Sequence, residues 1–188
     1  MFKMRAPSCL EKALEDAASS GDVATLQEIL NSSRAFKLLG LPLRAPRANF
    51  NNGKACVAAA GKGHAATLAM LLNWPEHAPR ADCMDGLALV EAAYAGHTEI
   101  VRMLLEWPEH APKSKEGVAM AFCGAAFRDH VNVLVVLVDV CPEWIKTDIL
   151  LDTAARLAQN QNGDCSALRY IRFLVAQVDR ARRLGTSS

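Results

Sequence analysis

A ten-residue segment occurs twice in this chain, and the interval between its copies restricts the folds that the chain can adopt. LLNWPEHAPR spans residues 71–80 and LLEWPEHAPK spans residues 104–113, so the copies begin 33 residues apart (104 − 71 = 33) and share eight of ten letters. Self-similarity at a fixed period of about 20–50 residues is the signature of a repeat architecture. Each copy then contributes one small structural unit to a continuous stack.

Recurring pairs of residues extend this period beyond the duplicated segment. Three kinds of residue pair recur at the same position in successive units. The Gly-His or Asp-His pairs are Gly63-His64, Gly96-His97 and Asp129-His130, and the alanine pairs are Ala59-Ala60, Ala92-Ala93 and Ala125-Ala126. The aliphatic pairs are Leu71-Leu72, Leu104-Leu105 and Leu137-Val138. A diverged first copy and a last copy with an insertion complete the series. The register predicts one domain over residues 1–188 with five units, roughly 8–33, 50–80, 83–113, 116–143 and 145–178.

Each unit has the pattern of two short helices. Small residues such as Ala92 lie at the centre of the first helix, where they allow neighbouring helices to approach closely. Apolar residues of the second helix follow an i, i+1, i+4, i+5 spacing, which is one face of an α-helix. Helices this short are marginal alone in water, so neighbouring units must bury their shared face. The predicted fold class is therefore all-α.

One stretch has the local pattern of a strand. Residues 131–140, VNVLVVLVDV, are rich in β-branched residues and on their own match a strand pattern. They follow FRDH, however, at the place where the other units have their second helix. The register therefore predicts a helix over residues 131–140.

The combined pattern resembles the ankyrin-repeat family, whose period is 33 residues. The resemblance covers most of residues 8–178, and AGHTEIVRMLL (residues 95–105) is similar to the family's turn and second helix. The family's T-P-L-H opening is absent, and W-P-E-H-A-P stands where its G-A-D-V-N finger begins. The resemblance implies an ankyrin-like solenoid of about five helix-turn-helix repeats, in which the histidine of each Gly-His turn bridges backbone groups of neighbouring loops.

The resemblance also implies where a partner would bind. Members of the family use the finger tips and the exposed face of each first helix as a concave surface for another protein. Carried over by register, the candidate positions here are Phe50, Lys62, Met84, Tyr94, Phe127, Arg128 and Arg156. Tyr94, Phe127 and Arg128 form the expected hot spot, because aromatic residues and arginine dominate interface energetics. Val135, expected to face outward on a second helix, is a candidate lateral contact.

Catalytic and metal-binding motifs are absent from the sequence. It has no H-E-x-x-H, no G-x-S-x-G and no glycine-rich phosphate loop. The histidines of successive units should lie about 8–10 Å apart, one helix-packing distance, whereas Zn–N bonds are about 2.0–2.1 Å. We therefore expect no catalytic site, no metal, no cofactor and no small-molecule substrate.

Two irregular segments and the C-terminus leave an alternative open. Units one and two are separated by an insert, residues 34–49, which we expect to be a Pro-interrupted loop; the basic residues from it to the next unit are Arg34, Lys37, Arg44, Arg47 and Lys54. The fifth unit has about eight extra residues, including QNQNGDC, predicted as a surface loop. The tail, residues 179–188, carries Arg180, Arg182 and Arg183. The alternative is a structural subunit of a larger assembly that contacts RNA through residues 34–54 and this tail.

Composition bounds the remaining choices. The net charge of +1 argues against nucleic acid as the main partner, and no apolar run reaches the roughly 18 residues of a membrane span. Six cysteines occur without a C-x-x-C pair in a chain that is 51% hydrophobic, which favours reduced thiols. We expect an intracellular protein, cytoplasmic or nuclear, while the slightly basic N-terminal segment leaves an organellar location open.

Overall fold

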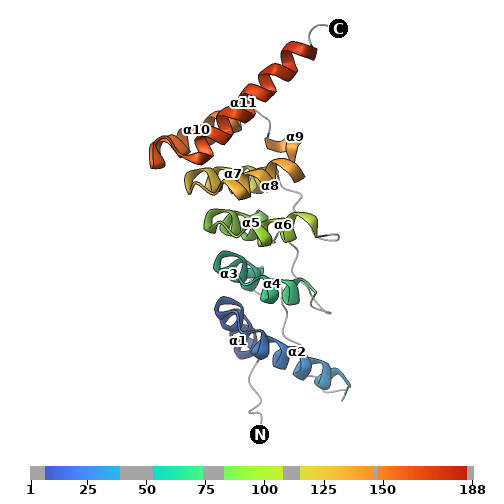
Figure 1. The fold of residues 1–188 in the computed structure, drawn as a ribbon. Coiled ribbons are helices and arrows are strands. Elements are labelled where there is room, and N and C mark those ends of the chain that lie inside the picture. Colours follow the sequence, from blue (N-terminus) through green and yellow to red (C-terminus); the bar gives the residue numbers. More distant parts are fainter. Residues whose placement is uncertain (1–6, 39–52, 74–82, 108–114, 146–147, 186–188) are drawn as a thin grey trace.

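The protein is built from helices packed in consecutive pairs (Figure 1). The computed structural model describes residues 7–38, 53–73, 83–107, 115–145 and 148–185, with side chains for 11–32, 53–73, 86–107, 115–145, 148–161 and 163–183. Every regular element within these ranges is a helix. The pairs are α1 (Pro7–Ser20) and α2 (Val23–Leu38), α3 (Lys54–Lys62) and α4 (Ala65–Leu72), α5 (Cys83–Ala95) and α6 (Thr98–Glu106), α7 (Lys115–Phe127) and α8 (Val131–Val140), and α10 (Asp148–Asn162) and α11 (Ser166–Gly185), with the short α9 (Pro142–Ile145) after α8.

The pairs are stacked in chain order, so α1 and α11 lie at opposite ends of the stack (Figure 1). The first helices of the pairs form one layer, in which α3 packs on α1, α5 on α3, α7 on α5 and α10 on α7. The second helices form the other layer, in which α4 contacts α2, α8 contacts α6 and α11 contacts α8. One continuous core therefore runs between the two layers.

The core is made by the residue pairs that define the register. The alanines Ala59, Ala60, Ala92, Ala93, Ala125 and Ala126 are all fully buried between first helices. Leu71, Leu104 and Leu137 are equally buried on the second helices. The valine-rich stretch is the helix α8, as the register predicted, and it buries Val133, Leu134 and Leu137. Burial of one helix face outweighs the weak helix propensity of β-branched residues.

A left-handed turn joins the two helices of each central pair. Gly63 and Gly96 have φ of +84° and +82°. In that conformation the N–H of Gly63 donates to the carbonyl oxygen of Ala60, and the N–H of His64 donates to that of Ala59. These bonds satisfy two carbonyl groups at the C-terminal end of α3. Glycine is favoured there because a side chain at positive φ is strained.

The boundary predicted after the first unit is wrong, because α2 continues to Leu38 and includes the start of the basic insert. Arg34 and Lys37 therefore lie in a helix and not in a loop. RAFKL contains no proline or glycine, so the sequence offers nothing to stop the helix before Gly40. Lys54 is the exposed first residue of α3, while Arg44 and Arg47 lie outside the described residues.

The extra residues of the fifth unit, predicted as a surface loop, are partly helical, and so is most of the tail. The polar residues Gln159–Asn162 belong to α10, which ends before Gly163 at φ +67°. Most of the predicted tail belongs to α11, which reaches Gly185. The guanidinium of Arg182 donates to the carboxylate of Asp148 at 2.8 Å, joining α11 to the start of α10. Insertions without helix-breaking residues have thus lengthened helices instead of adding loops.

Candidate functional site

Three of the predicted partner-binding residues form one cluster at the C-terminal ends of α5 and α7. The rings of Tyr94 and Phe127 are stacked, with centroids 6.2 Å apart and planes inclined by 17°. The guanidinium carbon of Arg128 lies 5.0 Å from the centroid of the Tyr94 ring. A cation over an aromatic face is attracted by the ring quadrupole, which is worth about 0.5–1 kcal/mol at an exposed site. We call Tyr94, Phe127 and Arg128 the aromatic cluster.

The aromatic cluster is open to solvent although its members support one another. Tyr94 is 41% exposed, Arg128 is exposed and Phe127 is half-buried. Gly124 lies beneath Tyr94, and a Cβ at Gly124 would be 3.7 Å from the tyrosine Cβ. The tyrosine therefore lies close over α7, next to Phe127. A half-buried, ordered aromatic pair with an adjacent arginine loses little rotamer freedom when a partner covers it.

The other predicted binding residues are more dispersed. Lys62 is exposed at the end of α3, and Arg156 is exposed on α10, where it forms an ion pair with Asp152 at 2.9 Å. Met84 belongs to α5, but its side chain, like all of Phe50, lies outside the part of the chain that the structure describes. Val135 is half-buried on α8. Among the predicted binding residues whose side chains are described, the structure therefore brings together Tyr94, Phe127 and Arg128.

Sequence reasoning missed two exposed apolar residues in the same layer. Met120 on α7 is 58% exposed and Ile149 on α10 is 84% exposed. Each stands five residues before an alanine of the register, Ala125 or Ala154, so they occupy equivalent positions on neighbouring helices. Leu87 is the half-buried equivalent on α5. Setting aside the core positions that the register assigns to each first helix, and comparing the remaining apolar residues, would have identified Leu87, Met120 and Ile149. We call these three residues the apolar row.

The turn histidines connect consecutive units. Nε2 of His97 donates to the carbonyl oxygen of Gly61 at 3.3 Å, and Nε2 of His64 donates to that of Ser19 at 3.2 Å; a carbonyl can only accept, which fixes the ring proton. Each ring also covers the turn glycine of the preceding unit. A Cβ built on Gly63 would lie 2.7 Å from the ring of His97. These contacts place the histidines in the structure of the stack, between one unit and the next.

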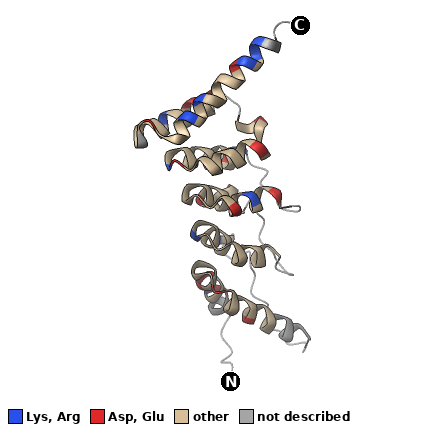
Figure 2. Cartoon of the chain, in the orientation of Figure 1, with Lys and Arg blue, Asp and Glu red and all other residues tan. Residues whose placement is uncertain are grey.

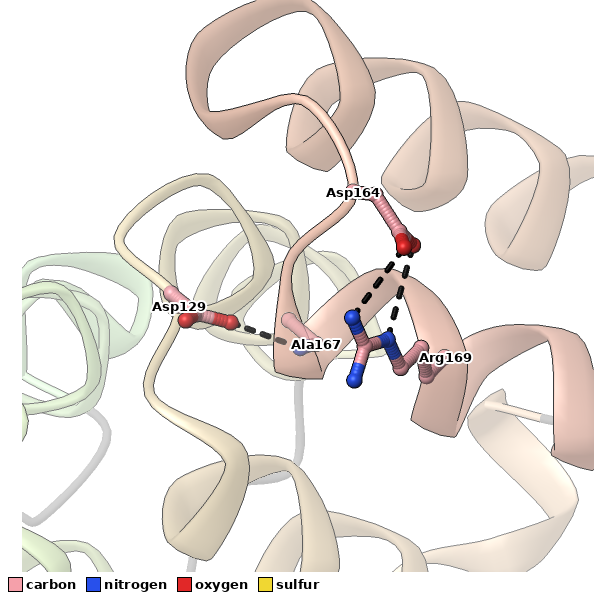
Figure 3. Close-up of polar contacts among 4 residues, drawn as sticks. All are labelled: Asp129, Asp164, Ala167 and Arg169. Atoms are coloured by element: carbon pink, nitrogen blue, oxygen red, sulfur yellow. Dashed lines mark hydrogen bonds and ion pairs between the residues drawn. The ribbon is translucent and has the colours of Figure 1, made fainter.

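The last joint of the stack is built differently (Figure 3). Asp129 occupies the turn position that is glycine in the preceding units, with φ +61°. Its carboxylate accepts the backbone N–H of Ala167 at 2.6 Å, at the start of α11. Cys165 precedes α11 at the position where histidine precedes α4, α6 and α8. An aspartate can therefore occupy this turn because no imidazole ring covers it.

Neither thiol chemistry nor a metal centre emerges from the described side chains. Burial raises the pKa of the Cys123 thiol, and burial followed by the charge of Glu143 raises that of Cys141, so both thiols are poor nucleophiles at neutral pH. Across the described ranges, no three His, Cys, Asp or Glu side chains gather closely enough to hold a metal ion. Among the described helices, none has the length and apolar character required to cross a membrane.

Comparison with family models, with curated proteins and with solved structures gave no match to this chain. The class is therefore defined by the structure alone: an all-helical protein whose helices pack in layers, with an aromatic cluster and an apolar row exposed on one layer.

Proposed function

We propose that the protein is a non-catalytic interaction module of the ankyrin type, which binds another protein through the exposed face of its first helices. The observation that carries the proposal is the aromatic cluster: a stacked Tyr94–Phe127 pair with Arg128 over the tyrosine ring, held on two neighbouring helices and open to solvent. Aromatic residues and arginine are the residue types that dominate binding hot spots.

The assignment to the ankyrin type is supported by the joints between units. The Gly-His turns recur at 33 residues, from Gly63-His64 to Gly96-His97. The histidines contact the preceding unit through a backbone carbonyl and a left-handed glycine. The contact of the histidine with a backbone carbonyl is what the resemblance implies for this position, and stacked helix pairs supply the extended surface on which such modules bind.

The chemistry of the face indicates what the partner should offer. Apolar groups would cover the ring pair and the apolar row of Leu87, Met120 and Ile149. A carboxylate or carbonyl would accept the guanidinium N–H groups of Arg128, which is planar and suited to bidentate contacts. A segment of a protein partner provides both kinds of group.

The remaining expectations belong to the same proposal. The described cysteines Cys56, Cys123, Cys141 and Cys165 are free thiols, which is typical of a reducing, intracellular compartment. We propose no cofactor and no small-molecule substrate. The alternative, an RNA-contacting structural subunit, has less support because Arg182 of the tail is engaged by Asp148.

Affinity capture with matched variants tests the proposal. The variant that removes the aromatic cluster, called the concave variant, is Tyr94→Ala/Phe127→Ala/Arg128→Ala. The control is Glu99→Ala/Arg102→Ala/Asn132→Ala, which changes three exposed positions on the second-helix layer. We expect a protein that is captured by the wild type and the control to be lost from the concave variant. Equal capture by both variants, with unchanged circular dichroism, would remove the aromatic cluster as the binding site.

A further inference from the structure

The outward face of α11 carries a line of arginines around an exposed phenylalanine. The inward face of this helix buries Ala167, Leu168, Ile171 and Leu174 in the core. The opposite face exposes Arg169, Arg172, Phe173, Ala176, Arg180 and Arg183, with Phe173 exposed to 56%. Arginines follow α11 to its C-terminal end (Figure 2). We call this set the arginine face.

The spacing on the arginine face is that of a helix seam. Arg169, Phe173, Ala176, Arg180 and Arg183 follow one another at intervals of four, three, four and three residues. Intervals that average 3.5 residues keep side chains on the side of a helix that packs against a second helix. The seam is about 21 Å long at about 1.5 Å per residue. Ala176, three residues after Phe173, is the smallest side chain of the seam.

The charge on this face is only partly balanced by nearby acids. The carboxylate of Asp164 accepts two bonds from Arg169, at 3.1 and 3.5 Å, and Asp148 engages Arg182 on the side of the helix (Figure 3 for Asp164). Asp179 contributes its charge to Arg182. Among the described side chains, no acid forms an ion pair with Arg172 or Arg180, which lie on either side of Phe173 along the helix, although the charge of Arg172 also contributes to lowering the pKa of Asp164.

Phe173 differs in exposure from its equivalent in the preceding unit. Phe173 precedes Leu174 as Val136 precedes Leu137, and in the fourth unit Val136 is buried. Phe173 itself is 56% exposed on α11. An aromatic residue left on this end, flanked by arginines, is a suitable apolar anchor for a separate chain.

We infer that the arginine face binds an acidic amphipathic helix of a partner protein, with an apolar residue of that helix over Phe173 and Ala176 and carboxylates beside Arg172 and Arg180. Three observations favour a helix over a nucleic acid or a membrane surface. The seam has helix-pairing intervals, its centre is apolar, and the whole chain carries a net charge of only +1. This surface is independent of the aromatic cluster.

The test uses the full chain and a synthetic helical probe. The probe is a peptide of about two heptads, matching the length of the seam, with leucine and alanine at the seam and glutamate on both flanks. A matched peptide carries glutamine in place of glutamate, and a single-stranded RNA and anionic phospholipid vesicles serve as competing ligands. Binding is measured by fluorescence anisotropy at several ionic strengths.

We expect the acidic peptide to bind, with an affinity that falls as salt rises, and the glutamine peptide to bind at least about tenfold more weakly. Arg172→Glu/Arg180→Glu should weaken the acidic peptide at least about tenfold, and Phe173→Ala should weaken both peptides. The control Arg102→Glu/Lys115→Glu changes the net charge equally at exposed positions away from α11 and should bind normally.

Three results would overturn the inference. They are equal weakening by the control and the α11 variant, indifference of binding to the α11 substitutions, and tighter binding of RNA or vesicles than of the acidic peptide. Loss of the aromatic cluster should leave peptide binding intact, so this inference and the proposed function fail separately. Circular dichroism of each variant establishes that the fold is retained.

Discussion

At the scale of single residues, the joint between units depends on a glycine that has no room for a side chain. Gly96 has φ +82°, and a Cβ built on it would lie 2.7 Å from the ring of His130. Gly96→Ala should therefore lower the free energy of unfolding by at least about 1–2 kcal/mol from left-handed strain alone, with the steric clash added. Thermal or urea unfolding measures the change.

Gly163 provides the matched control for that substitution. It also has positive φ, at +67°, but a Cβ built there meets nothing within 4 Å. Gly163→Ala should therefore show the strain without the clash. If both substitutions cost the same, the histidine ring does not restrict the turn.

The Asp164–Arg169 pair predicts a pH dependence at the same scale. Bonds from Arg169, and its charge, hold the pKa of Asp164 below its usual value of about 3.9. A carboxyl whose pKa is lower in the folded state stabilises the fold above the unfolded pKa, and this contribution is lost as the pH falls through the folded pKa. Arg169→Gln should raise the pKa of Asp164, which an NMR titration of its carboxyl carbon would detect. An unchanged pKa would mean that the pair does not form in solution.

At the scale of helices, close packing between first helices depends on alanine. Ala92 is fully buried in α5, which packs on both α3 and α7. Ala92→Leu should overpack these contacts and lower stability by about 1–3 kcal/mol. Ala95, exposed at the end of α5, gives the control Ala95→Leu, which should leave the melting temperature nearly unchanged. A stable Ala92→Leu variant would contradict the register.

The sequence predicted the type of the helices well and the ends of two of them poorly. Register identified α8 as a helix although its valines favour a strand, because position within a repeat reports burial and local propensity does not. The same register failed at the ends of α2 and α10, where inserted residues extend helices beyond the common unit. An insertion has no equivalent in the other units, so only local propensity applies, and those segments contain no early helix breaker.

The sequence likewise predicted one part of the candidate site and missed another. Tyr94, Phe127 and Arg128 could be predicted because their positions follow from the register, and their mutual stacking follows from adjacency of α5 and α7. Met120 and Ile149 were missed because an isolated apolar residue in a sequence is most often part of the core. No pattern within one unit separates them from core residues, whereas comparison between units places both five residues before an alanine of the register.

At the scale of the whole molecule, the last pair of helices should respond separately from the others. The contact from Asp129 to the N–H of Ala167 joins α11 to the preceding turn. Asp129→Ala should therefore accelerate amide hydrogen exchange in α11 more than in α3–α6, because stacked units exchange through local opening. Asp129→Asn keeps an acceptor and tolerates the left-handed turn, so it should protect α11 better than alanine does. Uniform acceleration along the chain would contradict this prediction.

The Gly-His contact has a consequence for the order in which such units can be joined. Each contact takes its glycine from one unit and its histidine from the next, as Gly63 and His97 do. A unit whose turn carries an aspartate like Asp129 therefore does not fit before a unit whose turn carries histidine, since the aspartate Cβ would meet the ring. In an engineered array, the second and third units could be copied in series, whereas the fourth needs a following unit that lacks this histidine, as the fifth does. The residue at each turn thus limits which unit can follow in the stack.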